Sequence, residues 1–359
     1  MKLTLQLHLL PTPEQHTALL DTMARFNAAA TFAAHTGFAA GVFGQVSIHH
    51  LAYYAIRERF GLSSQMAVRA IAKAVECFQR DKTVCPTFKA HSAICYDQRV
   101  LRFKGLNEVS LWALPGRLHM PFVCGAYQRA RQGRIQGQAD LVAREGKLYL
   151  LCTIDMPEEA PITPDDVIGV DLGIVNLAAD STGEIFSGTA VDATRQRYAR
   201  RRRVLNQVGT KSARRRLTKI RKREASFRRD VNHGISKQLV LKAKGTHAAL
   251  ALEDLTGIRQ RGTTVRKVQR SRHAGWAFRQ LRSFITYKAT LAGIPVLLVD
   301  PRNTSRTCAT CRHCEKANRK SQAVFVCHHC GYSTKADFNA ARNIRARALV
   351  NAPMVGMLS

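Results

Sequence analysis

Acidic side chains and long apolar runs are both scarce in this 359-residue sequence. Only 25 residues are Asp or Glu, against 56 Lys or Arg, which leaves a formal net charge of +31. A charge of this size repels itself unless a polyanion binds the chain, so nucleic acid is the expected partner and an anionic membrane surface the lesser candidate. Hydrophobic residues make up 45 % of the chain, an ordinary share for a globular protein, which excludes general disorder.

No apolar run in the sequence is long enough to form a membrane helix. The longest lies near 295–299, far short of the ~20 residues that such a helix needs. The residues after Met1 alternate between apolar and polar, which is typical of a strand and not of a signal peptide. We therefore expect a cytoplasmic protein with no membrane partner.

The positive charge is concentrated in the second half of the chain. Residues 1–164 carry 18 basic and 12 acidic side chains, whereas residues 165–359 carry 38 and 13. Sixteen Arg or Lys and one acid, Glu224, lie within 195–229. A solvated helical face is the plain alternative, but repulsion among so many cations favours phosphate contacts. The side chains expected to bind nucleic acid are Arg200, Arg201, Arg202, Arg203, Arg214, Arg215, Arg216 and Arg306.

The first region of the chain has the pattern of a strand, then helices, then strands. Residues 2–9 alternate as a strand. Thr12, Pro13 and Gln15 suit a helix start, because Thr caps the first turn and proline fits the first helical position. Helical segments at about 46–60 and 64–81 precede short strands, which begin near residue 84 and include a hairpin. The pattern predicts a small β domain with a helical insert.

The second region, which begins near 157–166, alternates strands with helices, as α/β folds do. A segment rich in Gly, Arg and Thr, 259–275, is expected to be a mobile loop. Strands are expected at 167–173, 174–179, 184–186, 248–252 and 295–299, and helices over 195–245, 278–292 and 336–350.

The ten cysteines are not distributed like a disulfide framework, because five are scattered and five lie within 308–330. Two CxxC pairs, fifteen residues apart, are made by Cys308, Cys311, Cys327 and Cys330. Four thiolates at this spacing are suited to converge on one Zn²⁺, and free or catalytic thiols are the alternative. Cys314 also forms a CxxC pair with Cys311, so it stays open whether it is a spare thiol or a substitute ligand.

Three of the few acids stand where a carboxylate needs a positive partner. Asp171 follows an apolar strand, Glu253 ends another, and Asp337 opens the final helix. Such a trio suits a site for two Mg²⁺ ions, in which one ion activates water and the other stabilises the leaving 3′ oxygen of a phosphodiester. The alternatives are ion pairs with arginine, or a helix N-terminal role for Asp337.

Five segments carry the most specific pattern: GVDLG (169–173), LEDL (252–255), TSRTCATC (304–311), NRKSQAVFVCHHCGY (318–332) and ADFNAARNI (336–344). In order and spacing they resemble the TnpB (OrfB) family of bacterial insertion sequences, which is similar to the compact ancestors of type V CRISPR effectors. The match is specific over 167–350 and weaker over 1–160. The chain departs from the family in the extra Cys314 and in Arg312, which stands where a small residue is common.

The resemblance implies an RNA-guided DNA endonuclease with a RuvC-type, RNase H-like nuclease domain. Asp171, Glu253 and Asp337 would be its catalytic carboxylates with two Mg²⁺ ions, and the four cysteines would hold one structural Zn²⁺. A guide RNA transcribed from the transposon end would pair with one strand of a double-stranded DNA target, beside a short transposon-adjacent motif. The expected assembly is a monomeric ribonucleoprotein near the bacterial nucleoid, with a dimer left open.

The resemblance also implies an α/β multidomain architecture. Its expected parts are a wedge β-barrel (1–10 and 84–160), a helical recognition insert (11–83), a RuvC-like domain (165–303 and 335–352) and a zinc ribbon that binds target nucleic acid (304–334). The alternatives are a strand-transferring transposase and a nuclease-inactive, RNA-guided DNA-binding repressor. The presence of all three acids favours an active nuclease.

Overall fold

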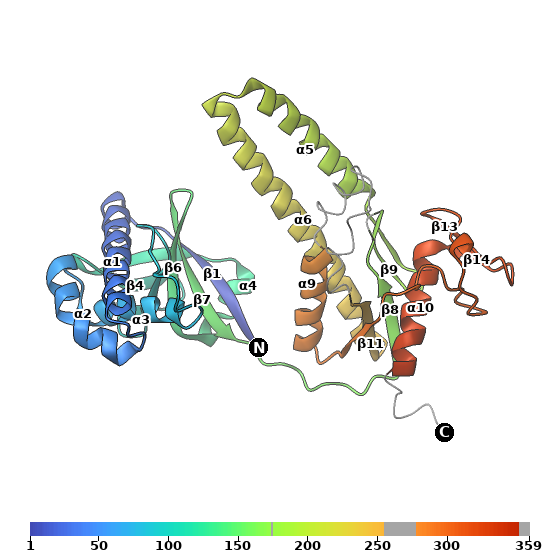
Figure 1. The fold of residues 1–359 in the computed structure, drawn as a ribbon, viewed down its shortest axis with the longest axis horizontal. Helices are drawn as coiled ribbons and strands as arrows, with labels where there is room; N and C mark the ends of the chain where they lie inside the picture. Colours follow the sequence, from blue (N-terminus) through green and yellow to red (C-terminus); the bar gives the residue numbers. More distant parts are fainter. Residues whose placement is uncertain (174, 255–277, 352–359) are drawn as a thin grey trace. The chain divides into compact units, whose positions relative to one another are not determined.

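The computed structural model describes residues 1–173, 175–254 and 278–351, and the chain divides into two units between Pro157 and Glu158. Figure 1 shows the elements of both. The expected loop at 259–275 lies outside the described residues. Within the described ranges, no helix has both the length and the apolar composition for crossing a membrane.

The helices of the first unit begin where the sequence predicts. In α1 (Pro13–Ala39), the Thr12 hydroxyl accepts a hydrogen bond from the Gln15 amide at 3.3 Å, and Gln15 Oε1 accepts one from the Thr12 amide at 3.1 Å. This reciprocal pair is a capping box, which satisfies two amides at the helix start. The helices α2 (Gln45–Phe60) and α3 (Ser64–Phe78) follow, and α3 ends three residues before the predicted boundary.

The strands of the first unit form one antiparallel, seven-stranded sheet in the order β2-β6-β7-β1-β5-β4-β3. They are β1 (Lys2–Leu9), β2 (Ile94–Asp97), β3 (Leu101–Lys104), β4 (Glu108–Ala113), β5 (Gly116–Val123), β6 (Ile135–Arg144) and β7 (Lys147–Asp155), and the short α4 (Ala126–Arg129) and η1 (Gln132–Arg134) lie between β5 and β6. The buried Tyr96 of β2 donates from its hydroxyl to the Trp112 carbonyl of β4 at 2.9 Å. This bond joins the first strand of the sheet order to the sixth, so the sheet is strongly curved.

Helices and sheet of the first unit share one hydrophobic core. Leu5 and Leu7 of β1, Phe26 of α1 and Phe78 of α3 are fully buried members of the same cluster, together with Leu150 of β7. The helical segment and the β segments therefore stabilise each other, although they were expected as separate parts.

The sheet of the second unit has five strands in the order β10-β9-β8-β11-β12. These strands are β8 (Asp166–Asp171), β9 (Asn176–Asp180), β10 (Ile185–Ser187), β11 (Ala248–Glu253) and β12 (Val296–Val299). The central β8 and β11 are parallel neighbours, as are β11 and β12, while β9 and β10 are antiparallel additions. Strands covered on both faces are apolar along their whole length, which explains the continuous apolar runs in the sequence.

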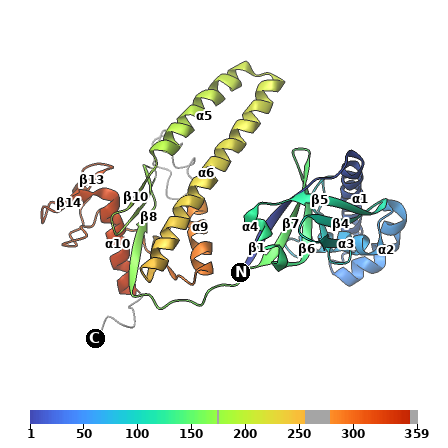
Figure 2. The ribbon, with the colours of Figure 1, turned by 180° about the vertical axis from the view of Figure 1, so that it is seen from behind.

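Helices cover both faces of this second sheet (Figures 1 and 2). On one face, α6 (Lys211–Gly245) and α9 (Phe278–Leu291) pack through residues such as Leu239 and Ile285. On the other face, α10 (Ala336–Asn351) packs through Ile344 and Ala348 against Val167 and Ala249. The second unit is thus a mixed α/β layer structure, as the sequence predicts.

The basic segment expected to be helical over 195–245 is two helices. The first, α5 (Thr189–Val208), ends at Gly209, whose φ of 67° is left-handed and suits glycine. Thr210 then caps α6, because its hydroxyl accepts from the Ala213 amide at 3.2 Å. The two helices run side by side and extend beyond the sheet (Figures 1 and 2), and we call them the basic arm.

A small ribbon lies between β12 and α10. It contains η3 (Lys316–Asn318) and the antiparallel strands β13 (Val324–Val326) and β14 (Ser333–Lys335). Its core is separate from those of the sheet and consists of Cys308, Phe325, Cys327 and Ala336.

Candidate functional site

The strand pairing of the second unit brings the predicted acids to one edge of the sheet. Asp171 ends β8 and Glu253 ends β11, and the register pairs Val170 with Leu252, the residues just before them. Carboxyl ends of parallel strands meet at the same edge, so these two acids are neighbours. Asp337 joins them from the first turn of α10, where its side chain is buried.

Gly169 explains how α10 can lie close enough to deliver Asp337. A Cβ at this position of β8 would lie 2.2 Å from the Ala341 carbonyl oxygen and 2.5 Å from the Arg345 amide nitrogen of α10. Both contacts are with backbone atoms, which cannot move aside as a flexible side chain can. The first glycine of the GVDLG segment therefore allows the close helix–strand packing on which the acid edge depends.

The acids affect each other's protonation. Burial, together with the nearby charges of Glu253 and Asp337, raises the pKa of Asp171 to about 8, and Arg319 opposes this shift. Burial also raises the pKa of Glu253. Carboxylates that share a partly buried site disfavour each other's ionised form unless a cation is present. Three such oxygen donors are a chemically suitable set for a hard divalent cation.

Three polar side chains that sequence reasoning missed contact the acids. Thr304 donates from its hydroxyl to Glu253 Oε1 at 2.6 Å, and Asn176 donates from Nδ2 to Asp337 Oδ2 at 2.8 Å. Arg319, from the ribbon, places Nη2 3.8 Å from Asp337 Oδ1. Thr304 and Arg319 lie in the TSRT and NRKS segments, but the sequence contained no sign that these segments reach the acid edge.

The four cysteines form the tight cluster that their spacing predicts. Their sulfur atoms lie within 4.8 Å of one another, with Cys308 Sγ 3.7 Å from Cys330 Sγ and Cys311 Sγ 3.5 Å from Cys327 Sγ. Among the residues that the structure describes, this is the one group whose ligand atoms meet so closely. Cys314 is exposed and lies outside the cluster. The first CxxC pair of the cluster is therefore Cys308 with Cys311, and not Cys311 with Cys314. A Cys₄ set of this kind suits a tetrahedral metal ion such as Zn²⁺.

Both CxxC turns end in a left-handed residue. Gly331 follows Cys330 with a φ of 74°, and its amide donates to the Cys327 carbonyl at 3.0 Å. Arg312 follows Cys311 with a φ of 64°, and its amide donates to the Cys308 carbonyl at 3.0 Å. The two turns are therefore equivalent, and the first has arginine where backbone strain favours glycine.

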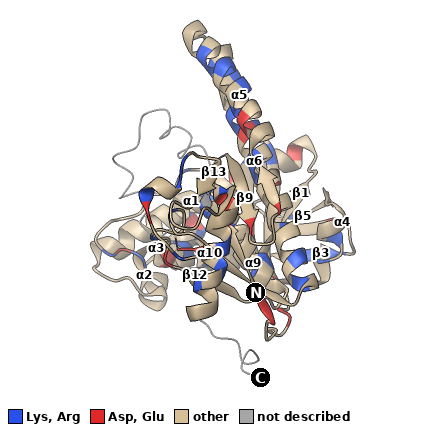
Figure 3. Ribbon diagram, turned by 90° about the vertical axis from the view of Figure 1, so that its right-hand side faces the viewer, with Lys and Arg blue, Asp and Glu red and all other residues tan. Residues whose placement is uncertain are grey.

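Seven of the eight arginines expected to bind nucleic acid are exposed, and one is not. The exposed residues are Arg200, Arg201, Arg203, Arg214, Arg215, Arg216 and Arg306. Arg202 instead forms an ion pair with the buried Glu224, which joins α5 to α6. The one acid of the 195–229 run is thus neutralised inside the basic arm. Figure 3 shows basic residues recurring along α5.

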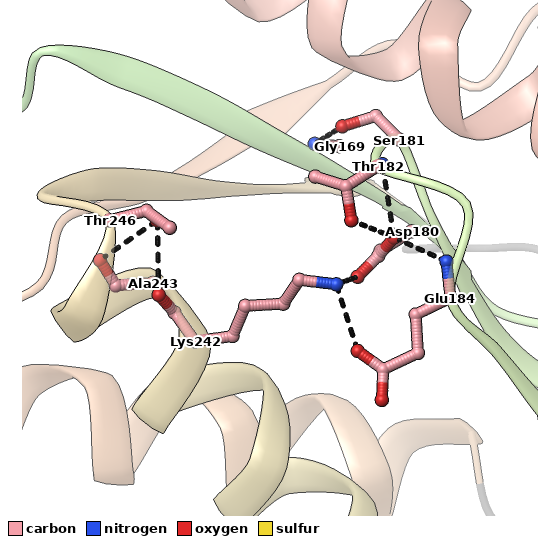
Figure 4. A network of polar contacts seen from close by, with 8 residues as sticks. All are labelled: Gly169, Asp180, Ser181, Thr182, Glu184, Lys242, Ala243 and Thr246. Atoms are coloured by element: carbon pink, nitrogen blue, oxygen red, sulfur yellow. Dashed lines mark hydrogen bonds and ion pairs between the residues drawn. The ribbon is translucent and has the colours of Figure 1, made fainter.

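A polar network supports the strand that carries Asp171 (Figure 4). Lys242 of α6 donates to Asp180 and, at 2.8 Å, to Glu184 Oε2. Burial would raise the pKa of Asp180, but hydrogen bonds from Lys242 and Thr182 outweigh it and lower that pKa. The next residue, Ser181, exchanges two hydrogen bonds with the Gly169 backbone, at 3.1 and 2.8 Å. The network therefore connects α6 to β8 two residues before Asp171.

Comparisons with known proteins were made against families, curated proteins and solved structures. Residues 150–256 match a family described as "Probable transposase" (OrfB of IS605), and residues 278–344 match the "Cas12f1-like, TNB domain" family. The CRISPR-associated endodeoxyribonuclease Cas12f1 of Sulfoacidibacillus thermotolerans is 28 % identical over 351 residues, covering 84 % of this chain and 82 % of that protein.

Two further proteins extend these matches. InsQ of Escherichia coli (strain K12), whose name describes an RNA-guided DNA endonuclease, is 28 % identical over 307 residues, covering 79 % of this chain and 73 % of that protein. The structure of the mini-RNA-guided endonuclease CRISPR-Cas_phi3 has a TM-score of 0.57 at 10 % identity, covering 99 % of this chain and 93 % of that one, a likeness that concerns the fold. The chain is therefore a relative of the TnpB (OrfB) and Cas12f proteins, which confirms the resemblance that its motifs predict.

Proposed function

We propose that this chain is an RNA-guided DNA endonuclease of the TnpB type, which hydrolyses phosphodiester bonds in DNA complementary to its guide RNA. The observation that carries the proposal is the meeting of Asp171, Glu253 and Asp337 at one edge of an α/β sheet. The names of the relatives support it, because Cas12f1 is an endodeoxyribonuclease and InsQ carries the name of an RNA-guided one.

The three acids share one role in this proposal, and their neighbours orient them for it. Asp171, Glu253 and Asp337 would hold Mg²⁺, which when bound activates water and stabilises the leaving 3′ oxygen. Thr304 and Asn176 orient the Glu253 and Asp337 carboxylates by the hydrogen bonds described above. Arg319 adds a positive charge beside Asp337 and favours the ionised form of Asp171. The chain itself thus orients its carboxylates before any metal or DNA binds.

The raised pKa of Asp171, about 8, gives cation binding a pH dependence. A carboxyl group with this pKa is mostly protonated at neutral pH, so a cation must displace that proton. The affinity of the acid edge for Mg²⁺ is therefore expected to rise with pH until Asp171 is fully ionised.

The proposed partners are a guide RNA and a double-stranded DNA target, bound as a monomeric ribonucleoprotein. The exposed arginines of the basic arm support contacts with phosphate groups, which are independent of sequence. The Cys₄ cluster would hold one structural Zn²⁺ that fixes the ribbon, from which Arg319 reaches the acid edge. The curved sheet and helices of the first unit are proposed to act as the wedge and recognition parts.

The experiment uses the full chain purified with its RNA, Mg²⁺ and a plasmid that carries a matching target. We expect cleavage of the matched plasmid and not of an unmatched one. Asp171→Asn, Glu253→Gln and Asp337→Asn should each abolish cleavage. The exposed Asp165, which lies outside the acid edge, provides the control Asp165→Asn, which should cleave normally. An uncut matched plasmid, or normal cleavage by all three acid variants, would contradict the proposal.

A further inference from the structure

A pocket lies at the opposite end of β8 from Asp171. Its volume is about 300 Å³, near the lower limit of typical ligand pockets. The residues that matter for its chemistry are Asp166, Ser181, Thr182, Arg312, Arg342 and Arg345, and we call it the arginine pocket. They come from the start of β8, the β9–β10 turn, the ribbon and α10, so four segments of the second unit build it.

The arginine pocket is electropositive. Three guanidinium groups and one carboxylate line it, and each guanidinium group already contacts another protein oxygen. Arg342 Nη1 donates to the Tyr332 hydroxyl at 3.0 Å, and Arg312 Nη1 lies 3.4 Å from Asn343 Oδ1. Arg345 Nη2 lies 2.7 Å from Asp166 Oδ1, and Arg345 Nε donates to the Val167 carbonyl at 3.0 Å. A guanidinium has five N–H donors, so each arginine has donors beyond these contacts.

Two features favour a tetrahedral oxyanion as the ligand of this pocket. Guanidinium groups bind phosphate oxygens in pairs of parallel hydrogen bonds, and several converging on one pocket increase that preference. The Ser181 Oγ accepts from the Gly169 amide at 3.1 Å, which leaves its own O–H hydrogen to donate. The pocket thus offers both charged donors, from guanidinium groups, and a neutral donor, from the Ser181 hydroxyl, on one concave surface.

Arg312 is the residue that sequence and fold leave unexplained. It is one of the two positions where the chain departs from the family that it resembles, and it adopts the left-handed backbone that Gly331 adopts in the equivalent turn. Strain of this kind points to a role for the side chain. Its place in the arginine pocket supplies that role.

We propose that the arginine pocket binds a phosphate group of a nucleic-acid backbone through Arg312, Arg342 and Arg345. The inference rests on the proposed function for the identity of the ligand, because RNA and DNA both supply this phosphate. The pocket lies away from the acid edge, so it holds a segment of nucleic acid that is not being cut. Binding there would fix how the bound strand crosses the ribbon and α10.

The test measures binding of the full chain to two fluorescent single strands, one of DNA and one of RNA with the same sequence, without divalent metal. Arg312→Gln retains the side-chain stem and the same backbone demand, and Lys316→Gln removes an equal charge from the same ribbon outside the pocket. We expect Arg312→Gln to weaken binding by about 3- to 10-fold and to lower the salt slope by about 0.7. Lys316→Gln should weaken it less than about 2-fold.

A variant of opposite sign separates phosphate binding from damage to the fold. Asp166→Asn removes the one negative charge of the arginine pocket. It keeps a side-chain oxygen for the hydrogen bond that Asp166 Oδ1 accepts from the Val167 amide at 2.6 Å. It should tighten binding by about 2-fold. If Asp166→Asn weakens binding instead, the loss in Arg312→Gln reflects damage to the fold and not a lost phosphate contact, and the proposal is wrong.

The two probes identify the source of the phosphate. A loss confined to the DNA strand assigns the pocket to the target, and a loss confined to the RNA strand assigns it to the guide. If Arg312→Gln behaves like Lys316→Gln with both probes, the pocket proposal is wrong and the proposed nuclease function is unaffected. If the unmodified chain binds neither probe, the proposed function itself fails.

Discussion

The acid edge and the basic arm belong to the same unit, yet the chain builds them by opposite means. At the acid edge, three carboxylates from β8, β11 and α10 depend on one strand register and on the close approach permitted at Gly169. On the basic arm, exposed arginines recur along two helices, and Arg202 with Glu224 provides an internal ion pair between them. Chemistry needs a few groups at fixed positions, whereas polyanion binding needs many charges and tolerates their movement.

The largest effect on binding is expected on the arm. Replacing Arg200, Arg201 and Arg203 together by Gln removes three exposed cations, which should weaken nucleic-acid binding by about 10- to 100-fold at moderate salt and lower the salt slope by about 2–3. Fluorescence anisotropy over a series of salt concentrations measures both. Because phosphate contacts carry no sequence information, matched and unmatched strands should lose affinity equally. A loss confined to the matched strand would contradict this interpretation.

A smaller effect, on stability, is expected below the acid edge. Lys242→Met leaves Asp180 buried without its cation, which should cost about 2 kcal/mol and lower the melting temperature by ~5 °C. This is less than the usual cost of removing one partner of a buried ion pair, because the Lys242 side chain is partly exposed. The control is Lys244→Met, two residues further along α6, where the lysine forms an exposed ion pair. This variant should change the melting temperature by less than ~1 °C.

This stability difference should depend on pH. The pKa of Asp180 is lowered in the folded chain, so its ionised form stabilises the fold above the ordinary aspartate value of ~3.9, and that contribution is lost as the pH falls through the folded-state value. In Lys242→Met, burial without the lysine makes Asp180 easier to protonate. The difference in melting temperature between the unmodified chain and Lys242→Met should therefore become smaller as the pH falls from about 7 to about 4. A difference that grows in acid would show that the ion pair is not its cause.

The smallest effect separates Arg202 from its neighbours. Arg202→Gln leaves the buried Glu224 unpaired and should lower stability by about 1 kcal/mol, with little loss of nucleic-acid affinity. Arg201→Gln, at an exposed position, should do the reverse. It should change the free energy of unfolding by less than ~0.5 kcal/mol and weaken nucleic-acid binding. Thermal melting and anisotropy on the two variants give the comparison. If the two variants lose stability and affinity to the same extent, Arg202 does not have the structural role that its ion pair with Glu224 indicates.

Sequence patterns predicted the elements and the two clusters because these depend on local chemistry. Thr12 and Gln15 carry the helix start in their own spacing, the CxxC pairs carry the metal geometry, and apolar strands ending in Asp171 and Glu253 mark the acid edge. The partners of these groups were not predictable, because they come from tertiary contacts.

Asn176 illustrates the limit, since it contacts Asp337 across 161 residues of sequence. Arg319 looked like one more surface cation of the ribbon, and only the packing of the ribbon on α10 places it beside Asp337. Arg202 was indistinguishable in sequence from Arg201 and Arg203, because only the pairing of α5 with α6 reveals which arginine faces Glu224.

The central claim is that the acid edge cuts and the basic arm binds. It is tested most directly by single-turnover cleavage of a matched plasmid, with the ribonucleoprotein in excess, measured alongside binding. Asp171→Asn should bind DNA within about 2-fold of the unmodified chain and cleave at least ~10²–10³-fold more slowly, whereas the triple arm variant should bind weakly and cleave at a near-normal rate once saturated. Normal cleavage by Asp171→Asn, or a slow rate in the saturated arm variant, would contradict the account.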